Sequence, residues 1–300
     1  MYSNNNIIKI KLVGLVGLGT MGKIIASRLV ENKFEVIGYD ISLEARRAAE
    51  DIGVKVTERL ADIGERSDVV LLSLPGPQEV REVVGGENGL LSKMHSGQII
   101  VDLSTVDPFT TNEVARKAKE KEVEYLDAPI LGRPVSIGRW VSPVGGERKI
   151  LEKCKPVLKT FCSKLVHVGP SGAGNTVKLI NQLMFSTINA ITVEVLAIAK
   201  KIGLSPEVVF NTISQSGAAT VSGLFCEVGK KIVKEDFEPI FSIELLCKDN
   251  GLGIEMAKKY GAFPLISSYV QMLNEIANIK GLGNKDTAAL IKVYEEFMNM

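Results

Sequence analysis

The chain has 300 residues with 45% hydrophobic and 24% charged residues, the balance of a globular protein of one large or two ordinary domains. Its net charge is +1, so no overall field attracts nucleic acid or an anionic membrane surface, and we expect neither as a partner. Four widely spaced cysteines without a CxxC pair, and only two histidines, argue against a zinc site or a redox dithiol, so we expect no metal.

Targeting signals are not expected either. The start, MYSNNNIIKIK, is polar and short for a signal peptide. By eye, no apolar run reaches the roughly 20 residues of a membrane span. We therefore expect a cytoplasmic protein.

The first half of the chain alternates short apolar runs with amphipathic segments. Each run is rich in leucine or β-branched residues and ends at turn residues, which is typical of buried strands. Strands that alternate with helices predict a parallel sheet covered on both faces, an α/β fold of the doubly wound Rossmann type. The seven expected strands lie within residues 11–17, 35–40, 68–75, 98–104, 123–129, 139–146 and 164–170.

The second half has a different pattern. PSGAGN (170–175) is a cluster of helix breakers, and the apolar stretch that follows predicts one long helix over about 173–202. The remaining segments show helical periods, punctuated by Gly217, Gly223, Gly251, Gly261 and Pro264. We expect a Rossmann domain over 1–169 and an all-helical domain over 170–300, joined by the long helix.

The long helix is apolar nearly all round, so it needs burial on several sides. Burial against a second copy favours a homo-oligomer, a homodimer or a homotetramer. The alternative is a monomer whose own helices cover it.

A nucleotide-binding loop follows the first strand. Gly17-x-Gly19-x-x-Gly22 permits a tight turn, a close approach of backbone to a pyrophosphate, and close packing of helix on strand. The N-terminus of the next helix offers free N–H groups to phosphates. Cofactor contacts are expected from the whole motif and from the end of the 68–75 strand, namely Gly17, Leu18, Gly19, Thr20, Met21, Gly22, Leu74 and Pro75.

Asp40 ends the second strand, 18 residues beyond Gly22. A carboxylate there accepts hydrogen bonds from ribose hydroxyls and repels a 2′-phosphate. The residues that follow, Ile41 and Ser42, are not basic, so NAD is the expected cofactor and NADP the lesser one. Arg46 and Arg47 lie close enough in sequence to reach back, or else they lie on a solvated helix face.

At this point the chain resembles the β-hydroxyacid dehydrogenase family, which includes 3-hydroxyisobutyrate dehydrogenases and glyoxylate or succinic semialdehyde reductases. The resemblance covers about residues 10–295. It implies hydride transfer between nicotinamide and a small 3-hydroxy acid, or its semialdehyde. It rests on GLGTMG with Asp40, LSTVDP (103–108), DAPILG (127–132), GAGNTVKLINQ (172–182) and the Lys248-Asp249 pair.

The GAGNTVKLINQ stretch resembles the catalytic signature of that family and carries Lys178 and Asn181. Their spacing places both on one side of the first turns of the long helix. No histidine is a plausible base, and a buried lysine can accept the proton of a hydroxyl or return it to a forming alkoxide. Lys178 is therefore the expected general acid/base, and Asn181 the residue that binds the same oxygen or orients the lysine. The alternative for Lys178 is a solvent-facing surface residue.

Other candidates are less decided. Ser104 and Thr105 follow a strand at its carboxyl end, where they could bind the substrate carboxylate or the cofactor. The alternative is a cap for the helix that starts near Pro108, for which Thr105 or Asp107 would also serve. Phe241 resembles an aromatic of the substrate pocket of the family, although core packing accounts for it equally well. Lys248 is expected to contact the cofactor, unless it lies on the surface.

The substrate loop departs from the family pattern, DAPVSGG. In this chain Leu131 replaces the serine, Gly132 is kept, and Arg133 replaces the second glycine. An arginine offers a fixed charge and a two-pronged donor to an anion, and Pro134 restricts Arg133 to extended backbone. Our hypothesis is that Arg133 anchors an acidic group of the substrate, the alternative being an ion pair with a nearby acid or a partner subunit. Trp140, in the next strand, is expected to pack.

Two other functions compete with a hydroxy acid dehydrogenase. Imine reductases resemble this chain in fold but prefer NADPH and generally lack the lysine, so Lys178 and Asp40 argue against that class. A nucleotide-binding protein without turnover is the second alternative, and it typically loses the lysine as well.

Overall fold

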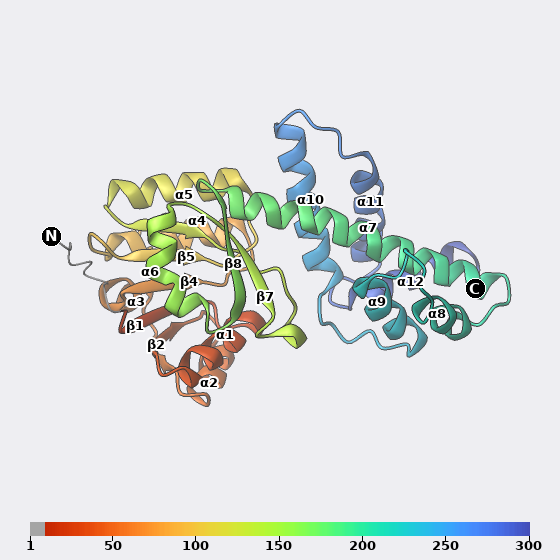
Figure 1. The fold of residues 1–300 in the computed structure, drawn as a ribbon, viewed down its shortest axis with the longest axis horizontal. Coiled ribbons are helices and arrows are strands. Elements are labelled where there is room, and N and C mark those ends of the chain that lie inside the picture. The colour runs from red at the N-terminus through yellow and green to blue at the C-terminus, as the bar shows by residue number, and fades with distance from the viewer. Residues whose placement is uncertain (1–9) are drawn as a thin grey trace. The chain divides into compact units, whose positions relative to one another are not determined.

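The computed structural model describes residues 10–300, which form two compact units, one ending at Lys178 and one spanning Leu179–Met300 (Figure 1). The first unit is α/β and the second is helical. The position of the domain boundary at 169/170 stays a prediction.

The first unit is built on one eight-stranded sheet with the strand order β3-β2-β1-β4-β5-β6-β7-β8. All pairs of neighbouring strands are parallel except β6 and β7. The seven expected strands are confirmed, although β7 runs against β6 and the two-residue β3 was not predicted. The strands are β1 (Leu12–Val16), β2 (Glu35–Tyr39), β3 (Lys55–Val56), β4 (Val69–Leu72), β5 (Ile99–Asp102), β6 (Glu124–Asp127), β7 (Trp140–Gly145) and β8 (Cys162–Gly169).

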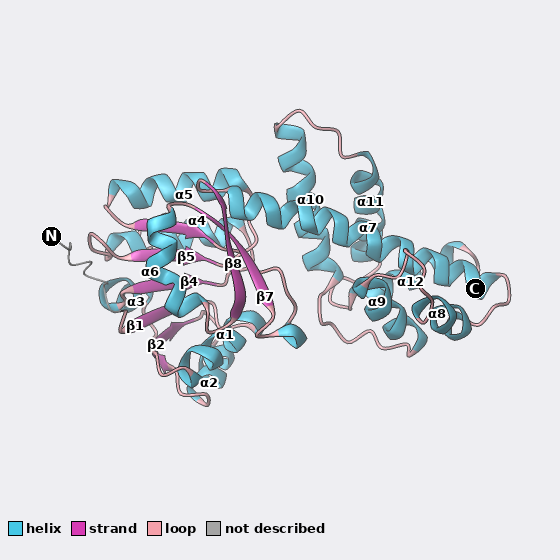
Figure 2. Cartoon of the chain, viewed as in Figure 1, coloured by secondary structure: helices cyan, strands magenta, loops and turns pink. Residues whose placement is uncertain are grey.

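Helices cover both faces of this sheet, as Figure 2 shows. Successive strand residues point to opposite faces, so β4 sends Val69 and Leu71 into one core and Val70 and Leu72 into the other. The first core includes residues of α1 (Thr20–Glu31), α2 (Leu43–Glu50) and α6 (Arg148–Leu158). The second includes residues of α3 (Leu60–Arg66), α4 (Pro77–Gly85) and α5 (Pro108–Glu120). The doubly wound Rossmann-type fold is confirmed.

The long helix α7 spans Ala173–Lys201, close to the expected range, and the second unit continues with α8–α12. These helices are α8 (Pro206–Ser214), α9 (Gly223–Val233), α10 (Ile243–Lys259), α11 (Leu265–Ile279) and α12 (Ile291–Phe297). Their core gathers Val193 and Leu196 of α7 with residues of α9, α10 and the 3₁₀ turn Thr287–Leu290. Gly251 does not interrupt a helix as expected, because it lies inside α10, where an added Cβ would make only ordinary contacts.

The sequence expectation on membrane spans is wrong for α7. By length and composition this helix is apolar enough to cross a membrane, with a mean hydropathy of 1.5 over 18 residues. Half of that window is buried inside the fold, and the core helix of a soluble protein passes the same test. Part of the apolar surface of α7 is thus buried within the protein.

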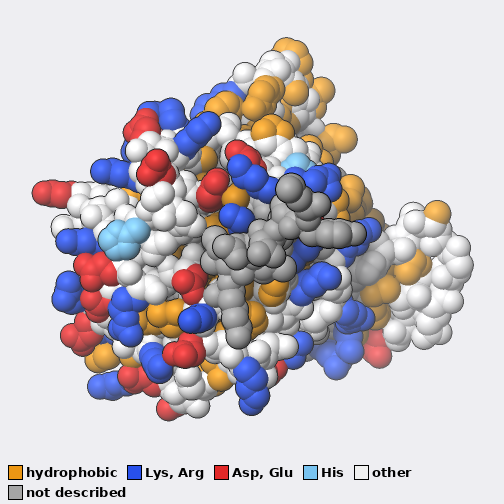
Figure 3. All heavy atoms as spheres, turned by 60° about the vertical axis from the view of Figure 1, so that its left-hand side comes forward, with side chains coloured by type: hydrophobic (Ala, Val, Ile, Leu, Met, Phe, Trp, Pro, Cys, Tyr) orange, Lys and Arg blue, Asp and Glu red, His pale blue; other side chains and the backbone are white. Residues whose placement is uncertain are grey.

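Acidic and basic side chains alternate over the face shown in Figure 3. Several of them form exposed ion pairs, such as Arg116–Glu120 on α5 and Lys55–Glu35 between β3 and β2. Such pairs contribute little to stability but balance the surface charge.

Candidate active site

The carboxyl ends of five strands lie in one row across the sheet. Residues in this row pair in register in the order Tyr39, Val16, Leu72, Asp102 and Asp127. Most of the candidates before Leu179 follow one of these residues within a few positions. This edge is where open α/β sheets bind their ligands.

The glycines of the first loop meet different demands. Gly17 has a φ of +91°, and a Cβ there would lie 2.1 Å from the Ser73 carbonyl oxygen. A Cβ on Gly22 would lie 1.9 Å from the Gly17 carbonyl oxygen, so these two glycines are required by the fold itself. Gly19 differs, because a Cβ there would meet no atom within 4 Å. The protein leaves space at Gly19, as expected where a pyrophosphate approaches the backbone.

The N-terminus of α1 is open to an anion. Gly19 is its N-cap residue, and no side chain caps the first turn, which contains no acid. Thr20 is exposed and Met21 is half-buried against the core, while Leu18 is buried. Free N–H groups beside an open glycine fit the phosphates of a dinucleotide.

Asp40 lies at the end of β2 and is tied to the same loop. Its carboxylate accepts hydrogen bonds from Leu18 N (2.7 Å) and Ser42 N (2.8 Å). A carboxylate has about four acceptor sites, so capacity remains for ribose hydroxyls. Arg46 donates to the Asp40 carbonyl oxygen at 2.9 Å, and its side chain is 16% exposed. Arg46 therefore does lie back against the end of β2, and it is not a solvated surface residue.

Ser104 is buried within a network at the end of β5. Its Oγ accepts from Leu74 N (2.9 Å), and its own N–H donates to Asp102 Oδ1 (2.9 Å). Asp107, and not Ser104 or Thr105, caps α5 by accepting from Phe109 N and Thr110 N. The capping alternative for Ser104 and Thr105 is therefore wrong.

Two buried carboxylates lie beneath this edge. Asp102 accepts from Ser104 N and from the Tyr125 hydroxyl (2.9 Å). Asp127 accepts from Gly172 N and Asn175 N, both at 2.9 Å. Burial raises the pKa of Asp102 and of Asp127 to about 6 in each case. Neither carboxylate was predicted as a site residue, although both end a buried strand at the ligand-binding edge.

Lys178 is not a solvent-facing residue. It is half-buried, and its Nζ donates to the Ile130 carbonyl oxygen at 2.9 Å. Ile130 lies three residues after Asp127, in the segment that leaves β6. The amine is thus held at the carboxyl edge of the sheet, where a proton acceptor or donor can serve a ligand.

The loop between β6 and β7 is held by its own contacts. Leu131 forms an antiparallel bridge with Val141, so its backbone N–H and carbonyl are used. A Cβ on Gly132 would lie 2.1 Å from a ring carbon of Trp140, so packing against the indole requires this glycine. The Arg133 carbonyl accepts from Trp140 Nε1 (2.8 Å) and from Ser136 Oγ (3.0 Å). The backbone of Leu131 and the carbonyl of Arg133 are thus engaged within the loop.

Two further expectations on this loop are confirmed. Arg133 has extended backbone, with φ −124° and ψ 159°, and it precedes a 3₁₀ turn, Pro134–Ser136. Trp140 is fully buried and packs edge-on against Phe161.

In the second unit, Asn181 begins a chain of polar contacts. Asn181 Nδ2 donates to Gln182 Oε1 (3.2 Å), and Gln182 Nε2 donates to Asp249 Oδ2 (2.7 Å). Lys248 Nζ forms an ion pair with Asp249 Oδ1 at 2.8 Å. The other carboxylate oxygen, Asp249 Oδ2, accepts from the Gln182 amide, so it fixes the orientation of that amide and thereby that of Asn181. Gln182 was not predicted, although it directly follows Asn181 in the signature.

Phe241 lies in the loop before α10 and packs edge-on against Phe185 of α7 at 5.4 Å between ring centroids. Its backbone N–H faces the buried Asp286 carboxylate. The structure thus places Phe241 in an aromatic pair within the second unit.

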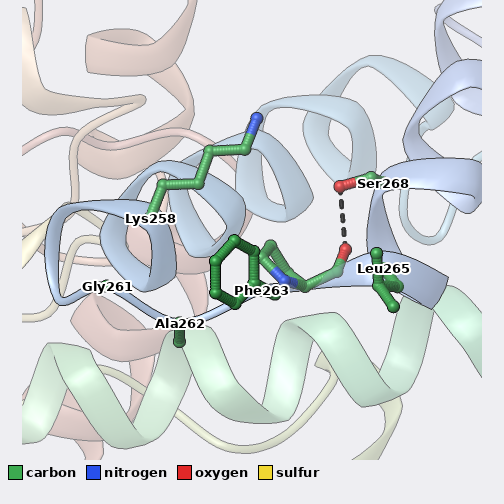
Figure 4. A pocket seen from close by; sticks show the side chains of 7 residues that line it. Lys258, Gly261, Ala262, Phe263, Leu265 and Ser268 are labelled. Carbon is green, nitrogen blue, oxygen red and sulfur yellow. Dashed lines mark hydrogen bonds between the residues drawn. The ribbon is translucent and has the colours of Figure 1, made fainter.

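A hollow of about 390 Å³ lies at the turn between α10 and α11, lined by apolar residues such as Phe263 and Leu265 (Figure 4). No predicted site residue lines it. Within residues 10–300, no cluster of His, Cys, Asp and Glu has the arrangement of a metal site.

Family models match both parts of the chain. Residues 12–169 match the NAD-binding domain of 6-phosphogluconate dehydrogenase. Residues 172–294 match the model described as NAD-binding of NADP-dependent 3-hydroxyisobutyrate dehydrogenase.

Individual proteins agree with the models. The 2-(hydroxymethyl)glutarate dehydrogenase of Eubacterium barkeri is 34% identical over 288 residues, 95% of each chain. A solved 3-hydroxyisobutyrate dehydrogenase from Salmonella typhimurium is 25% identical, with a TM-score of 0.86 over 94% of this chain and 99% of the other. That of Mycobacterium tuberculosis, solved with L-serine, is 26% identical, with a TM-score of 0.84 over 95% and 99%. The chain belongs to the β-hydroxyacid dehydrogenase family of nicotinamide-dependent oxidoreductases that act on hydroxy acids.

Proposed function

We propose that the protein oxidises a small 3-hydroxy acid with NAD, or reduces the corresponding semialdehyde, with Lys178 as the general acid/base. The observation that carries the proposal is the position of the Lys178 amine. It is half-buried and bonded to the Ile130 carbonyl, at the sheet edge that also carries the glycine loop and Ser104. A bound nicotinamide supplies the hydride acceptor at this edge.

The residues of the chain manage the proton. A neutral Lys178 amine accepts the proton of the substrate hydroxyl as the carbinol C–H bond breaks. In the reverse direction its ammonium returns that proton to the carbonyl oxygen and stabilises the developing negative charge. Ser104 lies at the same edge, tied to Leu74 and Asp102, in a position to contact the ligand. Asn181, three residues after Lys178 on the same helix, binds the reacting oxygen.

NAD is the proposed cofactor because Asp40 ends β2 with a carboxylate tied to the glycine loop. A second negative group beside it, the 2′-phosphate of NADP, is repelled. Arg46 donates to the Asp40 carbonyl oxygen, and its positive charge favours the 2′-phosphate of NADP. The measurement that decides is the ratio of kcat/KM for NAD and NADP, which we expect to exceed 10-fold in favour of NAD.

An acid is the proposed substrate because Arg133 stands in the loop where the family carries glycine. Its backbone is held by Trp140 and Ser136, and a guanidinium is a two-pronged donor whose shape and charge suit a carboxylate. The relative from Eubacterium barkeri is named for a glutarate, a dicarboxylic acid, so acids with two carboxylates belong among the candidates.

The test is NADH formation at alkaline pH with a panel of hydroxy acids. The panel holds 3-hydroxyisobutyrate, 3-hydroxypropionate, serine, 4-hydroxybutyrate, glycerate and 2-(hydroxymethyl)glutarate, with NADP run alongside NAD. We expect turnover with at least one 3-hydroxy acid. Tight nucleotide binding without turnover of any acid contradicts the proposal, and cyclic imines with NADPH would then test the imine reductase alternative.

A homo-oligomer is also proposed. Four apolar side chains on α7 lie 41–61% exposed at helical spacing, namely Ile180, Met184, Ile191 and Ile198. On α11 and the turn before it, Phe263, Leu265, Ile266 and Tyr269 are exposed by 67–88%. Apolar surface of this extent on one helical unit favours burial against a second copy. Light scattering should give twice or four times the 32.5 kDa chain mass. Met184→Glu should lower that mass, and a monomeric wild type refutes the proposal.

The proposed compartment is the cytoplasm. All four cysteines are free, and Cys154 and Cys162 are buried, so nothing in their arrangement calls for an oxidising environment.

A further inference from the structure

We propose that Asp127 is the positioning residue of the catalytic lysine: its buried carboxylate fixes the first turn of α7 and, with the segment that follows it, sets where the Lys178 amine lies. The inference rests on the proposed role of Lys178. Neither the family match nor the GAGNTVKLINQ motif assigns the positioning of Lys178 to Asp127. All the contacts that carry it lie before Leu179.

The start of α7 lacks a cap of its own. Its first turn contains no acidic residue. The missing acceptor comes from β6, 45 residues earlier, where Asp127 Oδ1 accepts from Gly172 N and Asp127 Oδ2 accepts from Asn175 N. Both oxygens of one carboxylate are thus committed to the N-terminus of this helix. A negative charge at this end of the helix also interacts favourably with the positive end of the helix dipole.

Three glycines give the carboxylate its place. A Cβ on Gly145 would lie 2.4 Å from Asp127 Oδ1, and a Cβ on Gly174 would lie 2.5 Å from the Asp127 carbonyl oxygen. Gly172 has a φ of +89°, which turns its N–H toward Asp127 Oδ1. The glycines of the GAGN stretch therefore serve the contact between β6 and α7, and any side chain there would push the helix away.

The same segment holds the helix a second time. Ile130, three residues after Asp127, accepts from Lys178 Nζ, which lies three residues after Asn175. A single stretch, 127–130, thus fixes both the beginning of α7 and the end of the lysine side chain one turn later. A shift of this stretch moves the anchor and the amine together.

The charge near the start of α7 comes from buried carboxylates. Asp102, the register partner of Asp127 on β5, is the other buried carboxylate close by, and it is taken up by Ser104 and Tyr125. Burial raises the pKa of Asp127 to about 6, so at the alkaline pH of the assay it is ionised. Its charge then lies about one helical turn from Lys178 and favours the ammonium form of the lysine.

The experiment uses Asp127→Asn, which keeps the shape and removes the charge. Its matched control is Asp68→Asn, the same change at a half-buried carboxylate that also accepts from two backbone N–H groups, those of Lys11 and Leu12, at the amino edge of the sheet. The pKa of Lys178 is measured by competitive labelling with acetic anhydride at a series of pH values, with mass spectrometry of the Lys178 peptide. This readout needs no turnover, so it remains valid if no hydroxy acid is oxidised and the proposed function fails.

We expect Asp127→Asn to lower the pKa of Lys178 by about half a unit or more, because a negative charge one turn away is lost. In the oxidation assay we expect kcat to fall about 10-fold or more, with the dissociation constant of NAD within threefold of wild type. Asp68→Asn should leave the pKa of Lys178 unchanged. An unchanged or higher Lys178 pKa in Asp127→Asn, or an equal shift in the control, overturns the proposal.

Gly172→Ala provides a second test if Asp127→Asn does not fold. This change strains one donor to the carboxylate by about 1 kcal/mol and keeps the charge. We expect kcat to fall at least fivefold without a downward shift of the Lys178 pKa. An unaltered kcat in this variant overturns the positioning role.

Discussion

Before Leu179, most candidate residues follow the ends of parallel strands, whereas from Leu179 onward the candidates lie on helices or in the loop before α10. The strand ends share one register row, so residues distant in sequence arrive at one edge without further contacts. No such rule places Asn181, Phe241 or Lys248. They are instead bound to helical neighbours, as Asn181 is through Gln182 to Asp249. We therefore expect substitutions at the sheet edge to have the larger effects on catalysis.

The largest effect is expected at Lys178. Lys178→Met should lower kcat by about 10³-fold, because the proton of the hydroxyl loses its acceptor. The dissociation constant of NAD, measured by fluorescence titration, should change little. Lys159→Met, an exposed lysine at the end of α6, serves as the control. A loss of less than about 10-fold in Lys178→Met means that another group moves the proton.

The buried carboxylate at the end of β5 should make stability depend on pH. The folded pKa of Asp102 is raised from 3.8 to about 6, so the folded state binds more protons than the unfolded state between these values. Its ionisation therefore costs stability as the pH rises, up to about 3 kcal/mol above pH 6. Urea unfolding of wild type and Asp102→Asn should show the variant gaining stability relative to wild type between pH 4.5 and 7.5. A difference that is constant with pH, or that shrinks as the pH rises, contradicts this assignment.

Arg133 tests the loop between β6 and β7. Arg133→Ala should raise KM for the acid substrate by about 10- to 100-fold, as expected for a lost hydrogen bond to a charged group. Affinity for NAD should stay the same, because the carbonyl of residue 133 still accepts from Trp140. Arg139→Ala, an exposed arginine of the same loop, should leave KM unchanged. Equal KM values for Arg133→Ala and wild type favour the ion-pair alternative.

The smallest effect is expected in the second unit. Gln182→Met keeps the size of the side chain and breaks the amide chain from Asp249 to Asn181, so kcat should fall about three- to tenfold. Gln271→Met removes an amide of the same unit that bonds to Asn250 and Cys247, and it should leave kcat unchanged. If Gln182→Met lowers kcat as much as Lys178→Met does, substitutions at the sheet edge do not have the larger effects on catalysis.

The sequence predicted the parts that depend on local patterns. Apolar runs such as VVLL predict buried strands, and alternation with helices leads to the Rossmann-type sheet. The glycine loop and Asp40 were predictable because a tight turn and a strand end impose residue types at fixed spacing. The two-residue β3 has too little pattern to be found in this way.

Contacts between distant segments were beyond sequence reasoning. Nothing in the local pattern indicates that Asp127 caps a helix 45 residues later. Gly132 resembled a substrate-binding glycine, and its close contact with Trp140 appears only once the loop is folded. Likewise, the sequence shows that α7 is apolar, but which of its faces are buried is known only from the fold.

The most direct test of the central claim follows the hydride itself. A 3-hydroxy acid active in the panel is labelled with deuterium on its carbinol carbon, and the mass of the reduced cofactor is measured after a single turnover. The account predicts that wild type transfers the label to NAD, and that Lys178→Met transfers the same label about 10³-fold more slowly while still binding NAD. Reduced cofactor without the label, or equal rates in the two proteins, would contradict hydride transfer assisted by Lys178.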